Sequence, residues 1–181
     1  MAKYELTDET KVVYGVTLHR IRALTAIGLT VAAGQLGGWV ESEKNLDLSG
    51  NAWVSGDARV SGDARVSGNA RVFGDAWVSG DARVSGNAWV SGNAWVSKTR
   101  HYLLIGPVGS EDRTVTICRT RADDTTGHYV QAGCWAGTVD QLAERITTAW
   151  PDLSEKKRAR YRGEYEAVIA LARPRIQRWV K

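Results

Sequence analysis

Apolar and polar positions follow a cycle of six between residues 48 and 97. Each unit reads aliphatic, Ser, Gly, Asn or Asp, Ala, then Arg or Trp. The cycle runs through eight units without an insertion or deletion, with one Phe in a Ser position. This period matches neither an amphipathic helix, at 3.6, nor a simple strand, at 2. Glycine at every sixth position also excludes collagen, which needs it at every third. The pattern predicts a solenoid in which each hexad forms a short strand and a turn.

The chemistry of each position within the hexad supports a solenoid. Ala and the aliphatic residue lie two apart, so they share one face of a strand, and the Arg or Trp between them points the other way. The Gly-Asn or Gly-Asp pair supplies the unusual backbone of a sharp corner. Since no single unit can bury its own apolar face, we expect stability to come from stacking coil on coil.

The tandem pattern aliphatic-x-x-x-Ala-x resembles the hexapeptide-repeat left-handed β-helix, which implies a left-handed coil of three hexads. The flanks YELTDETKVVYGVTLHRIRAL, AAGQLGGWVESEKNL, IGPVGSEDRTVTICRT and AGCWAGTVDQL resemble small uncharacterised hexapeptide-repeat proteins of bacteriophages and prophages. This second resemblance implies a phage-type origin and brings no catalytic residues with it.

We expect three regions along the chain. Residues 1–30 predict a β-rich N-terminal cap, and residues 31–97 the β-helix. Its first coil is irregular, with Gly34, Gly37 and Gly38 at corners and Val31, Leu36 and Val40 inward. After Ser97 the period ends, and residues 98–181 predict a small α+β domain of the order βββαα.

The C-terminal region carries ordinary strand and helix signals. The strands are expected at residues 102–105, 115–120 and 129–134. Thr138 and Gln141 form a capping box that starts a helix, and Pro151 closes that helix. Ser154 can cap a second helix, with an apolar line of Tyr161, Tyr165, Val168, Ile169 and Ala172.

Composition excludes several classes of protein. Hydrophobic residues make up 43% and charged residues 24%, as in a folded globular protein. No run approaches the roughly 18 apolar residues of a membrane span, and the first residues lack the apolar core of a signal peptide. We therefore expect no membrane partner and a cytoplasmic location in a bacterial host cell.

Few side chains suggest catalysis. The hexapeptide acyltransferases use a His as general base, offered from a coil or a loop, whereas His19, His101 and His128 all lie outside the repeat. The same three residues suit a metal site only in a special trimer geometry. Cys118 and Cys134 are expected to be buried, reduced thiols on neighbouring strands. We expect no enzyme, no cofactor and no metal, with an acyltransferase as the enzymatic alternative.

The outward positions of the repeat are rich in Trp and Arg. With 18 residues per coil, positions 18 apart stack at roughly 4.8 Å. Guanidinium over indole is worth ~0.5–1 kcal/mol per exposed contact. Such residues are also enriched at interface hot spots, so the rows are candidates for a subunit interface or a ligand surface. The rows are Trp53, Arg71 and Trp89; Arg59, Trp77 and Trp95; and Arg65 and Arg83.

The second candidate surface is the basic start of the last helix. The excess of positive charge lies in residues 98–181, with 15 Lys and Arg against 10 Asp and Glu. A cluster of this kind is either a solvated helix face or a footprint for a polyanion. The overall net charge of +4 favours a small anionic ligand over long nucleic acid. The cluster comprises Lys156, Lys157, Arg158, Arg160 and Arg162.

These observations give one leading hypothesis and several rivals. The leading hypothesis is a non-catalytic homotrimer that captures a small anionic ligand between subunits, with a nucleotide immune signal as the suggested ligand and sequestration against host defence as the role. Trp would stack on the base and Arg would bind phosphate. The rivals are a trimeric scaffold or virion-associated protein, the acyltransferase, and a carbohydrate-binding face.

Overall fold

The computed structural model describes residues 2–121 and 123–179. The chain divides into two compact units, residues 1–101 and residues 102–181. They are named the solenoid unit and the C-terminal unit below.

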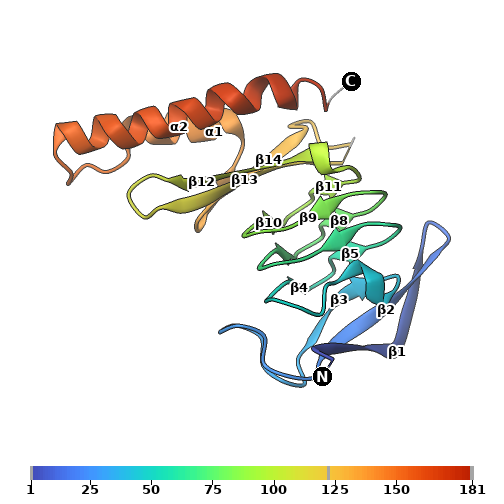
Figure 1. Ribbon diagram of the computed structural model, residues 1–181. Coiled ribbons are helices and arrows are strands. Elements are labelled where there is room, and N and C mark those ends of the chain that lie inside the picture. Colours follow the sequence, from blue (N-terminus) through green and yellow to red (C-terminus); the bar gives the residue numbers. More distant parts are fainter. Residues whose placement is uncertain (1, 122, 180–181) are drawn as a thin grey trace. The chain divides into compact units, whose positions relative to one another are not determined.

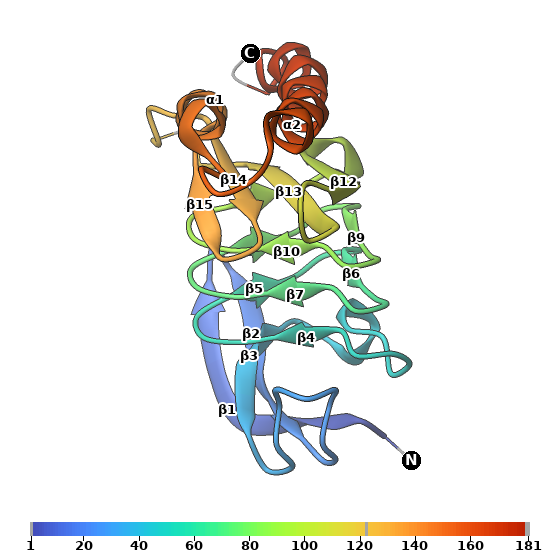
Figure 2. The same ribbon diagram turned by 90° about the vertical axis from the view of Figure 1, so that its left-hand side faces the viewer.

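The repeat folds into a parallel β-solenoid, as its period predicts (Figures 1 and 2). Its short strands pair in parallel with the strand 18 residues further on, as Trp53 does with Arg71 and Arg65 with Arg83. Three sheets result, and they contain the three predicted rows of outward residues. The strands are β4 (Trp53–Val54), β5 (Arg59–Val60), β6 (Arg65–Val66), β7 (Arg71–Val72), β8 (Trp77–Val78), β9 (Arg83–Val84), β10 (Trp89–Val90) and β11 (Trp95–Val96).

The inward and corner residues behave as the hexad predicts. Every Ala and Val of the repeat is at most 1% exposed, so the interior is a column of small and medium aliphatic side chains. The corner glycines have positive φ, +67° at Gly68 for example, and a Cβ there would lie 3.1 Å from the backbone nitrogen of Gly86. Glycine is therefore needed both for the backbone conformation and for the close approach of successive coils.

One corner of the solenoid carries an asparagine ladder that the sequence pattern did not reveal. Asn51 donates from Nδ2 to Oδ1 of Asn69 at 3.1 Å, and Asn69 donates in the same way to Asn87 at 3.2 Å. The corresponding positions of the next corner are Asp57, Asp75 and Asn93. A side-chain amide both donates and accepts, so only the amide corner can form such a chain.

The N-terminal cap continues one sheet of the solenoid. β1 (Tyr4–Val13) and β2 (Val16–Ala23) form an antiparallel hairpin, β2 pairs antiparallel with β3 (Leu36–Val40), and β3 pairs in parallel with β5. Lys3 ties the cap to the first coil, since its buried Nζ donates to the carbonyl oxygen of Ala52 at 3.0 Å. Burial lowers the pKa of Lys3, and the nearby Asp47 carboxylate partly opposes that effect.

Two expectations about the first coil were wrong. Gly37 and Gly38 lie within strand β3 and not at corners. A Cβ on Gly37 would come within 2.6 Å of the Trp53 ring, so glycine is needed there for space. These glycines make room for packing and do not form turns. Leu36 is 46% exposed and does not point inward, whereas Val31 and Val40 are buried as expected.

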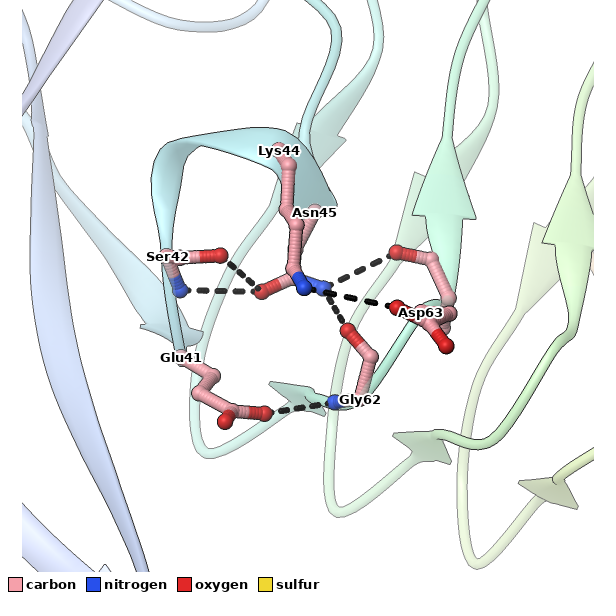
Figure 3. Close-up of polar contacts among 7 residues, drawn as sticks. Glu41, Ser42, Lys44, Asn45, Gly62 and Asp63 are labelled. Atoms are coloured by element: carbon pink, nitrogen blue, oxygen red, sulfur yellow. Dashed lines mark hydrogen bonds and ion pairs between the residues drawn. The ribbon is translucent and has the colours of Figure 1, made fainter.

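A short 3-10 helix, Glu43–Asn45, replaces a regular hexad before the repeat begins (Figure 3). The buried Asn45 amide donates to the carbonyl oxygens of Gly62 and Ala64 at 3.0 and 2.9 Å. Glu41 accepts from the Gly62 backbone N–H at 2.6 Å. The irregular turn is thereby fixed to the regular coil that follows it. After β11, a second 3-10 helix, Thr99–His101, ends the solenoid unit.

The C-terminal unit is an antiparallel sheet packed against two helices (Figure 2). Its core joins sheet residues such as Ile117 and Val130 to helix residues such as Leu142, Val168 and Ile169. The capping box at Thr138 is present, with the Thr138 side chain accepting from Gln141 N–H. The elements are β12 (Tyr102–Val108), β13 (Arg113–Arg119), β14 (His128–Ala132), β15 (Trp135–Gly137), α1 (Val139–Thr148) and α2 (Glu155–Ile176).

The structure adds a fourth strand to the three that were predicted. Gly133, with φ +61°, and Cys134 form a two-residue turn, after which Trp135 pairs with Ala132. The expected strand at residues 129–134 therefore ends early and turns back.

The turn also corrects the prediction that both cysteines are buried. Cys118 is buried, and burial raises the pKa of its thiol, whereas Cys134 is exposed in the turn.

Candidate functional site

The first outward row of the solenoid, on β4, β7 and β10, is not uniformly a surface. Trp53 is only 2% exposed, and it lies against Gly37 of the cap. Trp89 is 41% exposed and meets the Phe73 ring edge-on at 6.0 Å. Trp53 therefore serves the core of the solenoid unit, which its place in the repeat did not reveal.

The second row, on β5, β8 and β11, holds an aromatic stack. The Trp77 ring lies parallel to Trp95 at 5.9 Å and to Tyr14 at 5.1 Å. Tyr14 comes from the β1–β2 turn, far away in the sequence, so the periodicity of the repeat could not indicate it. Because the rings cover each other's faces, this row is suited to packing more than to presenting flat faces to a ligand.

The third row, on β6 and β9, borders a concavity of about 470 Å³. Arg65 and Arg83 are paired in register and exposed there, beside Lys44 and Asp47. The backbone and hydroxyl hydrogen bonds from Ser49 hold the pKa of Asp47 below its ordinary value, and Lys3 and Arg65 add to that effect. Cations and carboxylates thus both line this concavity.

The basic cluster on α2 is partly engaged within its own unit. Arg162 donates to the carbonyl oxygens of Ile146 and Thr147, at the C-terminal end of α1, at 3.3 and 2.9 Å. Arg158 donates to the carbonyl of Pro151, and Arg160 forms an ion pair with Glu164 at 3.0 Å. Arginines that cap a helix end stabilise it, while Lys156 and Lys157 remain exposed.

The three histidines lie in separate elements. His19 is on β2 opposite Val40, and His101 is buried at the end of the second 3-10 helix. His128 Nε2 accepts the backbone N–H of Val139 at 2.9 Å, which ties β14 to the start of α1. Across residues 2–121 and 123–179, no group of three His, Cys, Asp or Glu side chains is placed to hold a metal ion.

The C-terminal unit contains a cavity of about 420 Å³ that the sequence analysis did not identify. Its size falls in the range of small-molecule sites. Leu142, Ile146 and Tyr165 contribute apolar surface, and aromatic, cationic, carboxylate, hydroxyl and thiol groups also line it. The full lining is Ser110, Glu111, Arg113, Ala132, Gly133, Cys134, Trp135, Leu142, Arg145, Ile146, Thr148, Ala149, Trp150, Pro151 and Tyr165.

Two guanidinium groups reach the cavity from different elements. Arg145, on α1, lies over the Trp135 ring with its Cζ 5.9 Å from the ring centroid. Arg113, at the start of β13, runs along the β14–β15 turn at Gly133 and is paired with Glu111 at 2.6 Å. Both are exposed, so both charges are accessible to a ligand while their positions are restrained.

Trp150 reaches the cavity from the connection between the helices. Its Nε1 donates to the Ser110 hydroxyl at 3.0 Å, and its ring contacts Tyr161 and Tyr165, each at 5.7 Å between centroids. Tyr165 is itself placed by Gly109, where a Cβ would lie 2.7 Å from the Tyr165 ring. Burial raises the pKa of Tyr165, so its hydroxyl remains neutral at physiological pH.

These residues were missed because nothing in the linear sequence groups them. Ser110 is 40 residues from its partner Trp150, and Arg113 is more than 30 residues from Arg145. One signal in the sequence was the unusual aromatic composition, with eight Trp against one Phe. Trp135 and Trp150 lie outside the repeat, so the repeat does not explain their presence.

Comparison with known proteins supports the repeat. The family model of the YdcK beta-solenoid repeat matches residues 64–80 and 82–98. No curated protein matches the chain. The match and the observed coils together identify a repeat β-solenoid protein. Neither described helix combines the length and the apolar character needed to cross a membrane.

Proposed function

We propose that the protein is a non-catalytic binding protein that captures a small anionic ligand in the cavity of its C-terminal unit. The observation that carries the proposal is the convergence of Arg113, Arg145, Trp135 and Trp150 on one cavity of about 420 Å³. Guanidinium groups bind phosphate or carboxylate oxygens, often through two hydrogen bonds. A concave site that combines aromatic and aliphatic surface with a few placed polar groups is typical of a ligand site.

The ligand class and the assembly follow from the same reasoning. A nucleotide combines a ring that stacks on Trp with a phosphate that binds Arg, so a nucleotide signal of host defence, sequestered by a phage-type protein, is the proposed physiological ligand. The solenoid is the proposed site of trimer formation, since its outward rows carry exposed Trp and Arg, which are enriched at interfaces.

A structural scaffold is the second candidate, and the unbroken solenoid favours it. The coils run from β4 to β11 without an inserted loop, and aromatic stacking and an asparagine ladder stiffen them. A scaffold would need only the solenoid and its self-association, whereas the proposed function also needs the cavity.

Native mass spectrometry of the full chain as purified from cells separates the two functions. A trimer with a few hundred daltons of extra mass per chain supports capture. The Arg145→Gln variant should then lose that mass and remain trimeric. A trimer without added mass, which also binds no nucleotide in a titration with a panel of mononucleotides, would favour the scaffold. A monomer would contradict the proposed assembly.

A further inference from the structure

The backbone at Trp150 is unusual for its residue type. Trp150 has φ +59°, in the left-handed region that bulky residues rarely adopt. The next residue is Pro151, and a proline restricts the residue before it still further. Such strained residues cost of order 1–3 kcal/mol and cluster at ligand clamps and active sites.

The contacts around Trp150 show what the strained backbone achieves. It places the indole on the cavity wall, where Nε1 donates to Ser110 and the ring meets Tyr165 at an interplanar angle of 32°. The tilt leaves the rings unstacked, and Trp150 remains partly exposed. Its indole is thus anchored at the nitrogen and tilted against Tyr161 and Tyr165, and its exposed part is available to a ligand ring.

The cationic side of the cavity is built separately. Arg145 is held over the Trp135 ring, and Gly137 makes room for that ring, since a Cβ there would lie 2.8 Å from it. Arg113 is held by Glu111. Cation and ring are therefore each positioned by neighbours before any ligand arrives, which lowers the cost of binding.

We infer that Trp150 is the ring-stacking clamp of this cavity, and that the ligand is a flat aromatic ring bearing a compact oxyanion that Arg145 binds. The inference rests on the proposed function and narrows it, because it assigns the ring and the acid of the ligand to different side chains. A ligand without a ring, such as inorganic phosphate, would lack one of the two contacts.

Calorimetric titration of the full chain with 1-naphthyl phosphate tests the inference, with inorganic phosphate as the ring-less comparison. We expect 1-naphthyl phosphate to bind at least about tenfold more tightly than phosphate, the gain expected from one stacked ring. Trp150→Leu should weaken binding about tenfold or more, and Trp150→Phe should retain most of it. Arg145→Gln should weaken binding to a similar degree.

Matched variants control for general effects. Trp89→Leu removes a partly exposed Trp of the solenoid unit, and Arg175→Gln removes an exposed charge of α2 outside the cavity. Both should leave the affinity for 1-naphthyl phosphate unchanged. Circular dichroism of each variant verifies folding. If Trp150→Leu does not fold, the comparison of 1-naphthyl phosphate with phosphate on the wild-type chain still tests the ring contact.

Two results would overturn the inference. One is that 1-naphthyl phosphate binds no more tightly than phosphate, and the other is that either Trp150→Leu or Arg145→Gln leaves its affinity unchanged. The proposed function fails separately. A co-purifying anionic ligand without a ring, seen by mass spectrometry, would leave capture standing and remove only the ring-stacking clamp.

Discussion

The two units of this chain use their residues in opposite ways. In the solenoid unit the same six-residue unit is repeated. Each side chain therefore has an equivalent neighbour 18 residues away, as Trp77 has in Trp95. In the C-terminal unit each contact occurs once, as between Trp150 and Ser110. Repetition yields a uniform rod, whereas single-use contacts can gather unlike groups around one cavity.

The largest expected effect comes from an unpaired charge inside the rod. Val84→Asp places a carboxylate where the side chain is fully buried, and an uncompensated buried charge costs about 3–5 kcal/mol. Ser85→Asp, at the next and exposed position, should cost little. Hydrogen exchange of the full chain should show lost protection in residues 2–101 for Val84→Asp. An equal loss of protection in residues 102–121 and 123–179 would contradict the expectation that the damage stays within the solenoid unit.

The second prediction contrasts two glycines of the C-terminal unit. Gly109→Ala meets a φ of +76° and the Tyr165 ring at 2.7 Å, so we expect a loss of about 2–3 kcal/mol and a perturbed cavity. Gly163→Ala lies in α2 with open space around the new methyl group. It should raise stability by up to about 1 kcal/mol. Chemical denaturation measures both, and changes of the same sign would contradict this account.

The third prediction tests the corner that carries the asparagine ladder. Asn69→Ala removes one hydrogen bond to Asn51 and one to Asn87, and these exposed bonds should together contribute about 1 kcal/mol. Asp75→Ala changes an exposed residue of another corner and should be nearly neutral. Thermal denaturation distinguishes them. If both variants behave alike, the ladder is not a source of stability.

The smallest effect is a pH dependence in the C-terminal unit. The backbone N–H of Gly109, and then Arg160, hold the pKa of Glu164 below its ordinary value of 4.5. Because the folded pKa is depressed, the contribution of Glu164 to stability is present above about pH 4.5 and is lost as the pH falls through the folded value. Denaturation of wild type and Glu164→Gln should therefore differ at pH 6 and converge as the pH falls below 4.5 and through the folded value. A constant difference would contradict this assignment.

The sequence predicted the rod well because its determinants are local and repeated. The three rows of outward residues were predicted from the six-residue spacing of the apolar positions, the corner glycines and the 18-residue coil. The pairing of β4, β7 and β10 confirms one of these rows. The same logic failed where the cap interferes. Trp53 is equivalent to Trp89 in the repeat, but packing next to Gly37 buries only Trp53.

The cavity could not be predicted for a physical reason. Its wall depends on a turn at Gly133, within residues 129–134 that were predicted as one strand, and on a strained backbone at Trp150 that the sequence gives no means to anticipate. The basic cluster of α2 was visible in the sequence, but two of its arginines bind the carbonyl oxygens of α1 and of the turn after it. Charge alone did not reveal which cations the fold already uses.

The asparagine ladder also constrains how this rod can change length during evolution. Its members are 18 residues apart, one per coil. A duplicated or deleted coil would lengthen or shorten the rod by one step of roughly 4.8 Å and keep amide above amide. A change of a single hexad between Asn51 and Asn69 would instead bring an Asp opposite Asn51. The ladder therefore favours changes of length by whole coils over changes by a single hexad.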